Sequence, residues 1–189
     1  MIKDTVVLDI ETKNSFAEVG GRDNLNKLEV SFVGLYSYAE GKNFSFRETQ
    51  LKELGEFLKN VGCIVGFAVN RFDIPVLNKY VDFDLWTIPR IDLLEEIEMS
   101  VGWRIGLDRL AQVNLGVGKT SHGLEAIKFY NEGNWDKLES YCLNDVKITK
   151  ELYELAKQDG YLVVPHRVTG AAIKASFNLS ESVIPQTLF

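Results

Sequence analysis

The sequence predicts an α/β domain built around a mixed β-sheet. Three strand-like segments come first, a helix and a fourth apolar strand follow, and most of the remaining chain has a helical pattern. The spacing of apolar residues changes from two to three or four at Leu51, which marks the first helix. With 189 residues and 46% hydrophobic content, the chain is long enough for one well-buried core and short for two full domains.

The predicted strands begin close to the N-terminus. Residues 5–10 (TVVLDI) are apolar on both alternating faces apart from Asp9, which is typical of a strand covered on both sides. Residues 30–38 and 43–48 also have strand character, and the sequence Glu-Gly-Lys at 40–42 separates them. This pattern predicts a β-hairpin.

Helices are expected to dominate the rest of the chain. Apolar residues recur at helical spacing from Leu51 to Val61, and Gly62 is expected to end that helix before a short strand at 63–69. Residues 70–131 contain many glycines and prolines, which favours short helices separated by turns.

A longer helix is predicted between two recognisable caps. Asn134 is a good N-cap, and an apolar stripe at steps of three and four continues to Gly160. Residues 161–164 and 171–177 then predict a small C-terminal hairpin.

Composition limits the possible functions. The formal net charge is -6, which argues against a broad basic surface for long nucleic acids but not against a nuclease that holds cations with carboxylates. No apolar run is long enough for a membrane span and no signal-peptide pattern is present, so a cytoplasmic protein is expected. Cys63 and Cys142 lie in apolar runs and predict reduced thiols, while His122 and His166 lack the spacing of zinc ligands.

Three aspartates occupy positions where an apolar residue is expected. Asp9 interrupts the first strand, Asp73 lies in an apolar segment, and Asp145 lies on the apolar stripe of the long helix. Strand alternation places Glu11 on the same face as Asp9, and helical spacing places Tyr141 one turn before Asp145. If the strand packs against the helix, these side chains converge.

Converging carboxylates repel one another and need cations to neutralise them. Hard oxygen ligands select Mg²⁺ or Mn²⁺, and a pair of such ions supports hydrolysis of a phosphodiester.

Three segments carry a family resemblance. VVLDIET (6–12), NRFDIPVL (70–77) and YCLNDV (141–146) resemble, in this order, the exonuclease motifs of the DnaQ-like DEDDy group of the ribonuclease H-like superfamily. The resemblance extends over about residues 5–157, and the chain also looks like the YprB-like ribonuclease H-like proteins. It implies a ribonuclease H-like mixed sheet flanked by helices, and a 3′-5′ exonuclease that acts on the 3′ ends of single-stranded DNA or RNA.

The resemblance also implies roles for individual residues. Asp9, Glu11, Asp73 and Asp145 would be the metal ligands for two Mg²⁺ or Mn²⁺ ions, with Asp9 bridging both. Tyr141 would orient the attacking water.

Two further residue roles follow from the same resemblance, and a domain division is expected beside them. Thr12 would lie near the terminal nucleotide, and Asn70 matches an asparagine that often precedes the Phe-Asp pair of the second motif. Residues 1–160 would form the exonuclease domain, and the hairpin and tail at 161–189 would belong to that domain or form an interaction extension.

Structural alternatives remain for several of these residues. Asp73 stands where a helix could start ahead of a proline, and Tyr141 could be an ordinary core tyrosine. Asp92 and Glu95 have the spacing of a capping box, so Asp92 is interpreted as a helix cap and not as part of the site. The alternative function is a catalytically weak or inactive nucleic-acid-binding module that serves a helicase or polymerase partner.

Two short segments partly match known binding motifs. Residues 115–120 (LGVGKT) lack the first glycine of a P-loop and predict a turn before a helix capped by Ser121. Lys119 and His122 could contact a substrate phosphate, although a solvated loop is the simpler interpretation. The tail at 182–189 loosely resembles sliding-clamp-binding peptides, and a frayed terminus is the alternative.

Overall fold

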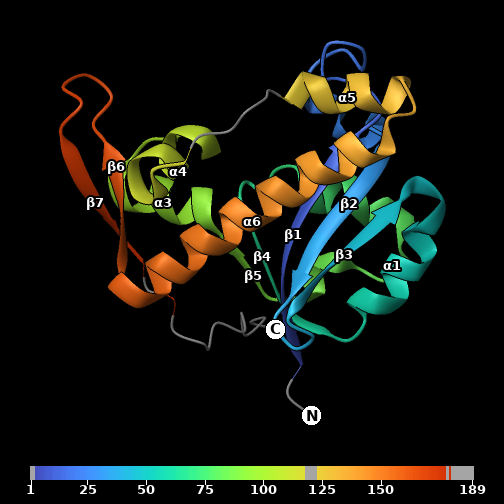
Figure 1. The fold of residues 1–189 in the computed structure, drawn as a ribbon, viewed down its shortest axis with the longest axis horizontal. Helices are drawn as coiled ribbons and strands as arrows, with labels where there is room; N and C mark the ends of the chain where they lie inside the picture. Colours follow the sequence, from blue (N-terminus) through green and yellow to red (C-terminus); the bar gives the residue numbers. More distant parts are fainter. Residues whose placement is uncertain (1–2, 118–122, 178, 180–189) are drawn as a thin grey trace.

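The protein is an α/β structure with a central mixed sheet (Figure 1), as the sequence predicts. The computed structural model describes residues 3–117, 123–177 and 179. The sheet has the strand order β3-β2-β1-β4-β5. Strands β1, β2 and β3 pair antiparallel, whereas β4 pairs parallel with both β1 and β5. The strands are β1 Asp4–Thr12, β2 Val30–Ser37, β3 Lys42–Arg47, β4 Val61–Gly66 and β5 Arg90–Asp92.

Helices cover both faces of this sheet, and a separate two-stranded hairpin follows the last helix. The α-helices are α1 Leu51–Leu58, α2 Asp73–Leu77, α3 Leu93–Val101, α4 Leu107–Leu115, α5 Gly123–Asn131 and α6 Trp135–Asp159. The 3-10 helices are η1 Arg22–Lys27, η2 Glu48–Gln50, η3 Asn78–Tyr80 and η4 Leu85–Thr87. The hairpin consists of β6 Tyr161–Pro165 and β7 Ala172–Ser176.

Strand β1 divides its side chains between two apolar layers. Val6, Leu8 and Ile10 belong to the buried cluster that contains α1 and α2, while Val7 belongs to the cluster that contains α6. Because side chains alternate along a strand, Asp9 and Glu11 share the α6 side with Val7. The sequence pattern therefore determines which helix can meet these acids.

The structure corrects the predicted end of the first helix and the predicted start of the strand that follows it. Helix α1 ends at Leu58, and Val61 already pairs with Asp4 as the start of β4, so the helix does not continue to Gly62. A Cβ at Gly62 would lie 2.6 Å from the Cβ of Lys3, which means that this glycine permits close strand packing and does not stop a helix. Strand β5 was not predicted because a three-residue strand is too short to show a period.

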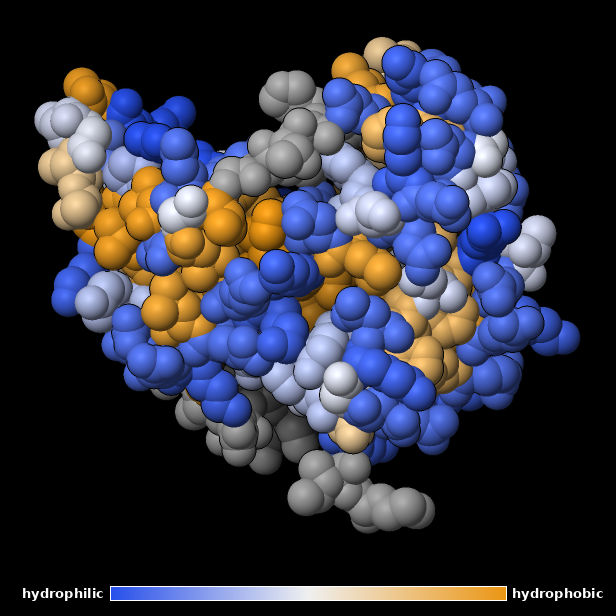
Figure 2. Space-filling model, viewed as in Figure 1, coloured by the Kyte–Doolittle hydropathy of each residue, from blue (hydrophilic) through white to orange (hydrophobic). Residues whose placement is uncertain are grey.

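The predicted C-terminal hairpin is confirmed, and it packs on helices of the main body. Leu162, Val164 and Ala175 share a buried cluster with residues of α3, α4 and α6. Figure 2 shows hydrophobic surface gathered over the region of α3, α4 and β6 in the same view. The hairpin therefore shields part of the apolar surface that these helices present.

Helix α6 packs closely against the sheet at Gly34 of β2. Gly34 is the cross-strand partner of Asp9 in β1. A Cβ added to Gly34 would lie 3.0 Å from Cys142 Sγ, 3.1 Å from Leu143 Cδ2 and 3.3 Å from Val146 Cγ2. The absence of a side chain at this position lets α6 pack directly over the acid-bearing part of β1.

Replacement of Gly34 by alanine tests this close packing. The added methyl group meets three α6 side chains, so Gly34→Ala should lower the free energy of unfolding by about 1–3 kcal/mol in urea denaturation. The control is Gly106→Ala, because nothing lies within 4 Å of a Cβ built there. Alanine is a weaker N-cap than glycine, but it also lowers the conformational entropy of the unfolded chain. These two effects oppose each other, so the free energy of unfolding of Gly106→Ala should change by no more than about 0.5 kcal/mol. Equal effects of the two substitutions would contradict the packing argument.

Candidate active site

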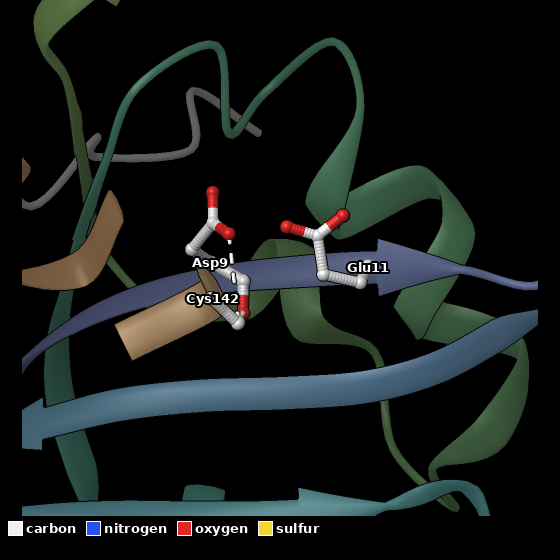
Figure 3. A group of neighbouring side chains, drawn as sticks. All are labelled: Asp9, Glu11 and Cys142. Atoms are coloured by element: carbon white, nitrogen blue, oxygen red, sulfur yellow. Dashed lines mark hydrogen bonds between the residues drawn. The ribbon is translucent and has the colours of Figure 1, made fainter. Parts of the chain in front are cut away.

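Asp9 and Glu11 lie side by side at the C-terminal half of β1 (Figure 3). Asp9 is partly exposed and Glu11 is buried. One carboxylate oxygen of each lies within 4.8 Å of the other and of Cys142 Sγ on α6. The Cys142 thiol lies within hydrogen-bond distance of two acceptors on Asp9, the backbone carbonyl oxygen at 3.4 Å and Oδ2 at 3.6 Å. A strand and a helix thus meet at this acid pair.

Asp73 joins the pair from α2. It is the first residue of that helix, and Asp73 Oδ1 accepts a hydrogen bond from the backbone N–H of Ile10 at 3.0 Å. The side chain is 3% exposed, and burial raises the pKa of Asp73 to about 7 despite the opposing effect of the Ile10 N–H. Asp73 therefore occupies the predicted helix start, and its carboxyl also contacts the strand between Asp9 and Glu11.

Tyr141 and Asp145 complete the group from α6. Both are buried, at 8% and 4% exposure, and both line one cleft of about 340 Å³ together with Asp9, Glu11 and Asp73. The structure thus brings together the five residues that the sequence singled out as catalytic. Tyr141 also belongs to a buried apolar cluster on β2, α5 and α6, so the core-tyrosine interpretation describes part of its surroundings.

Thr12 and Asn70 lie in different surroundings. Thr12 lines a neighbouring cavity of about 430 Å³ that shares Glu11 with the acid cleft, and its hydroxyl donates to the Asn14 carbonyl at 2.8 Å. The Asn70 side chain is instead engaged by Glu95 and by Arg90, whose Nε donates to it at 2.9 Å. The structure therefore places Thr12 next to the cleft and does not place Asn70 among the residues that line it.

Asp92 is a structural cap, as predicted. Its carboxylate accepts hydrogen bonds from the backbone N–H groups of Leu94 and Glu95 at the start of α3, and from those of Ala68 and Asn70. Ala68 has φ +66, a left-handed conformation that costs a non-glycine residue about 1–2 kcal/mol. Asp92 thus fixes the strained loop that leads from β4 into the cleft.

Several lining residues were missed at the sequence level. Among the described residues, Arg22, Arg71 and Arg104 line the acid cleft, and Cys142 contacts Asp9. Burial, followed by the charge of Asp9, raises the pKa of the Cys142 thiol well above its usual range, so Cys142 acts here as a neutral hydrogen-bond donor. Two features of the sequence could have indicated these residues: Cys142 directly follows Tyr141, and Arg71 lies inside the second motif.

The acid cleft fits hard divalent cations. The carboxylates of Asp9, Glu11, Asp73 and Asp145 supply oxygen ligands from three separate elements. The raised pKa of Asp73 reflects burial of a carboxyl group, a cost that a neighbouring cation removes. Oxygen donors favour Mg²⁺ and Mn²⁺ over the softer metals that prefer thiolates. The donor set therefore agrees with the predicted cations.

Comparison with known proteins identifies the family. The RNase_H superfamily matches residues 6–157, which include all five residues of the cleft. The chain belongs to the RNase_H superfamily. This membership supports a nuclease-type function that uses divalent metals. No curated protein sequence matches the chain.

Among solved structures, this RNase_H superfamily chain is similar to the family B DNA polymerase from the hyperthermophilic archaeon Pyrobaculum calidifontis. The two share 20% sequence identity with a TM-score of 0.63. The similarity covers 83% of this chain and 25% of the polymerase, so the chain spans about a quarter of that protein's length. At this identity the likeness establishes the fold.

Some predictions concern residues outside the described part of the chain. The proposed helix cap Ser121, the phosphate contacts of Lys119 and His122, and the clamp-binding interpretation of 182–189 all fall there. Within the described part, no helix is both long enough and apolar enough to span a membrane.

The capping role of Asp92 can be tested by substitution. Asp92→Ala removes the acceptor for four backbone N–H groups, so it should lower the free energy of unfolding by about 2–4 kcal/mol. Asp84→Ala is the matched control, because the carboxylate of the exposed Asp84 accepts from the Trp86 N–H alone among the described residues, and this variant should lose about 0.5–1 kcal/mol. A similar loss for both variants in urea denaturation would exclude the special role of Asp92.

Proposed function

We propose that the chain is a metal-dependent 3′-5′ exonuclease of the DnaQ-like DEDDy group, acting on single-stranded DNA or RNA. The observation that supports this proposal is the convergence of Asp9, Glu11, Asp73, Tyr141 and Asp145 on one cleft. These residues come from β1, α2 and α6, and their order along the chain is that of the three exonuclease motifs. Similarity to a DNA polymerase supports nucleic acid as the substrate class.

The carboxylates would hold two Mg²⁺ or Mn²⁺ ions. Asp9, Glu11, Asp73 and Asp145 are the ligands we assign, because their oxygens line the same cleft. When bound, the ions supply charge neutralisation for the phosphate and a more acidic water for attack on phosphorus. Cys142 is not assigned as a ligand, because Mg²⁺ and Mn²⁺ prefer oxygen donors to sulfur; its thiol contacts Asp9 from the side of α6.

Tyr141 would position the attacking water with its hydroxyl. Its ring is held in an edge-to-face contact with Phe129, with ring centroids 6.5 Å apart. A side chain fixed in this way can present one hydroxyl group at a defined place in the cleft, which is the requirement for orienting a nucleophile.

The neighbouring cavity suits the base of the terminal nucleotide. Phe16 and Phe72 line both this cavity and the acid cleft, and their ring centroids lie 5.7 Å apart. Aromatic faces stack on any base, so this contact tolerates different sequences and also both sugar types. Thr12 lines the same cavity, in agreement with a position near the terminal nucleotide.

Cleavage of labelled oligonucleotides tests the proposed activity. With Mg²⁺ or Mn²⁺, 5′-labelled single-stranded DNA or RNA should give a descending ladder that chelator abolishes, while circular single-stranded DNA stays intact. Asp9→Asn and Asp145→Asn should each lower kcat/KM at least about a hundredfold, because each removes a metal ligand. The matched control is Asp136→Asn, an exposed acid in the first turn of the same helix as Asp145, which should leave the rate unchanged. No product with any metal, or cutting of the circle, would contradict the proposal.

A substitution of one atom tests the role of Tyr141. Tyr141→Phe keeps the ring packed against Phe129 and removes the hydroxyl, so kcat should fall about tenfold or more while KM and stability stay close to wild type. Steady-state kinetics and thermal unfolding on the same preparation separate an effect on catalysis from an effect on stability. An unchanged kcat would leave Tyr141 as a packing residue.

A further inference from the structure

Two arginines in the acid cleft are held by a single carboxylate. Arg71 Nη1 lies 2.7 Å from Glu98 Oε2, and Arg104 Nε donates to both carboxylate oxygens of Glu98 at 3.1 Å. Arg71 follows β4, Arg104 lies between α3 and α4, and Glu98 belongs to α3. Three segments are thus tied together beside the carboxylates of the cleft.

This arginine pair keeps a net positive charge and remains accessible. Glu98 neutralises one of the two guanidinium groups, which leaves one positive charge for the trio. The side chains of Arg71 and Arg104 are 40% and 55% exposed, and both line the cleft. Each guanidinium group carries five N–H donors, and the contact with Glu98 uses a minority of them. The remaining donors suit an anion with several oxygens.

Arg90 illustrates the contrasting structural use of arginine in this protein. Its Nη1 donates to the backbone carbonyls of Leu85, Trp86 and Ile88, and its Nε donates to Asn70. Those contacts use the N–H groups of Nη1 and Nε to hold a turn. Among the described residues, Arg71 and Arg104 contact no such carbonyls.

We propose that Arg71 and Arg104, held together by Glu98, bind a backbone phosphate on the 5′ side of the linkage that is hydrolysed. This inference rests on the exonuclease function proposed above. A strand whose terminal linkage lies at the carboxylates has further phosphates only on its 5′ side, and the arginines line the same cleft of about 340 Å³. Guanidinium groups bind phosphate through paired, charge-assisted hydrogen bonds, and prior fixing by Glu98 lowers the entropy cost of that binding. The preferred substrate is therefore longer than a dinucleotide.

Neutral phosphate analogues test this site directly. The substrates are 5′-labelled oligonucleotides with a single methylphosphonate at the second or third linkage from the 3′ end, compared with an unmodified strand and with one modified far from that end. For the wild-type protein, one of the two near substitutions should raise KM about tenfold with kcat changed less than about threefold, the size expected for a charge-assisted contact. The far substitution should have no effect.

The variant Arg71→Gln with Arg104→Gln supplies the second half of the test. It should raise KM about tenfold on the unmodified strand and show no further rise on the methylphosphonate strand, because the same contact is already lost. Arg109→Gln is the matched control: Arg109 is an arginine of α4 whose Nη1 donates to Gln112 and which does not line the cleft. Arg104→Gln alone replaces the double variant if circular dichroism shows that the latter is unfolded.

The outcomes separate this inference from the proposed function. The arginine site is wrong if the wild-type protein cleaves the strands and neither near methylphosphonate raises its KM. It is also wrong if a near methylphosphonate raises the KM of the double variant as much as that of wild type. Both results leave the proposed nuclease function intact. If the wild-type protein cleaves nothing, the proposed function fails. Fluorescence anisotropy with the same strands then tests whether the arginines bind phosphate. The arginine site predicts that the wild-type protein binds the near methylphosphonate strand more weakly, and that the double variant binds all strands equally.

Discussion

Helix α6 rests on the sheet at a point where β2 has no side chain. Gly34 lies opposite Asp9 in the antiparallel pair, and three α6 side chains lie 3.0–3.3 Å from the place where a Cβ would stand. This close packing allows the Cys142 thiol to reach Asp9. It also places Tyr141 and Asp145, on the same helix, along the cleft that β1 and α2 line from the other side. The arrangement of the whole acid group therefore depends on how closely one helix approaches two strands.

The acid group imposes an electrostatic cost that the surrounding residues only partly relieve. Burial raises the pKa of Asp73, and the Ile10 N–H opposes that rise. The Cys142 thiol stays protonated and donates to Asp9, which adds a hydrogen bond without adding negative charge. The positive side chains that line the cleft are Arg22, which lies over the Phe16 ring, and the arginine pair Arg71 and Arg104. Cations held by the carboxylates would remove the remaining repulsion.

The position of the candidate site was predictable from the sequence because its aspartates stand where apolar residues are expected. An aspartate in an apolar strand or on an apolar helical stripe is conspicuous, and strand and helix periods then place Glu11 and Tyr141 on the same faces. The fold class followed from the same periods, and the RNase_H superfamily match agrees with it.

The parts that escaped prediction depend on contacts between distant segments. Strand β5 is defined by pairing with β4, and its three residues have no period of their own. Arg71 and Arg104 become a pair only through Glu98, a residue on a different element from either. Asn70 has the residue type expected beside the second motif, yet Glu95 and Arg90 hold its side chain away from the lining of the cleft. These contacts join segments that are distant in the sequence, so no local sequence pattern indicates them.

Anomalous diffraction from crystals grown with Mn²⁺ tests the central claim most directly. Data collected at the manganese absorption edge should contain peaks inside the cleft, about 2.0–2.3 Å from carboxylate oxygens of Asp9, Glu11, Asp73 and Asp145. The Cys142 sulfur should stay outside the coordination sphere because Mn²⁺ prefers oxygen ligands to sulfur ligands. Peaks confined to other surfaces, or a manganese ion bound to Cys142, would contradict the assignment of this cleft as an oxygen-ligand metal site.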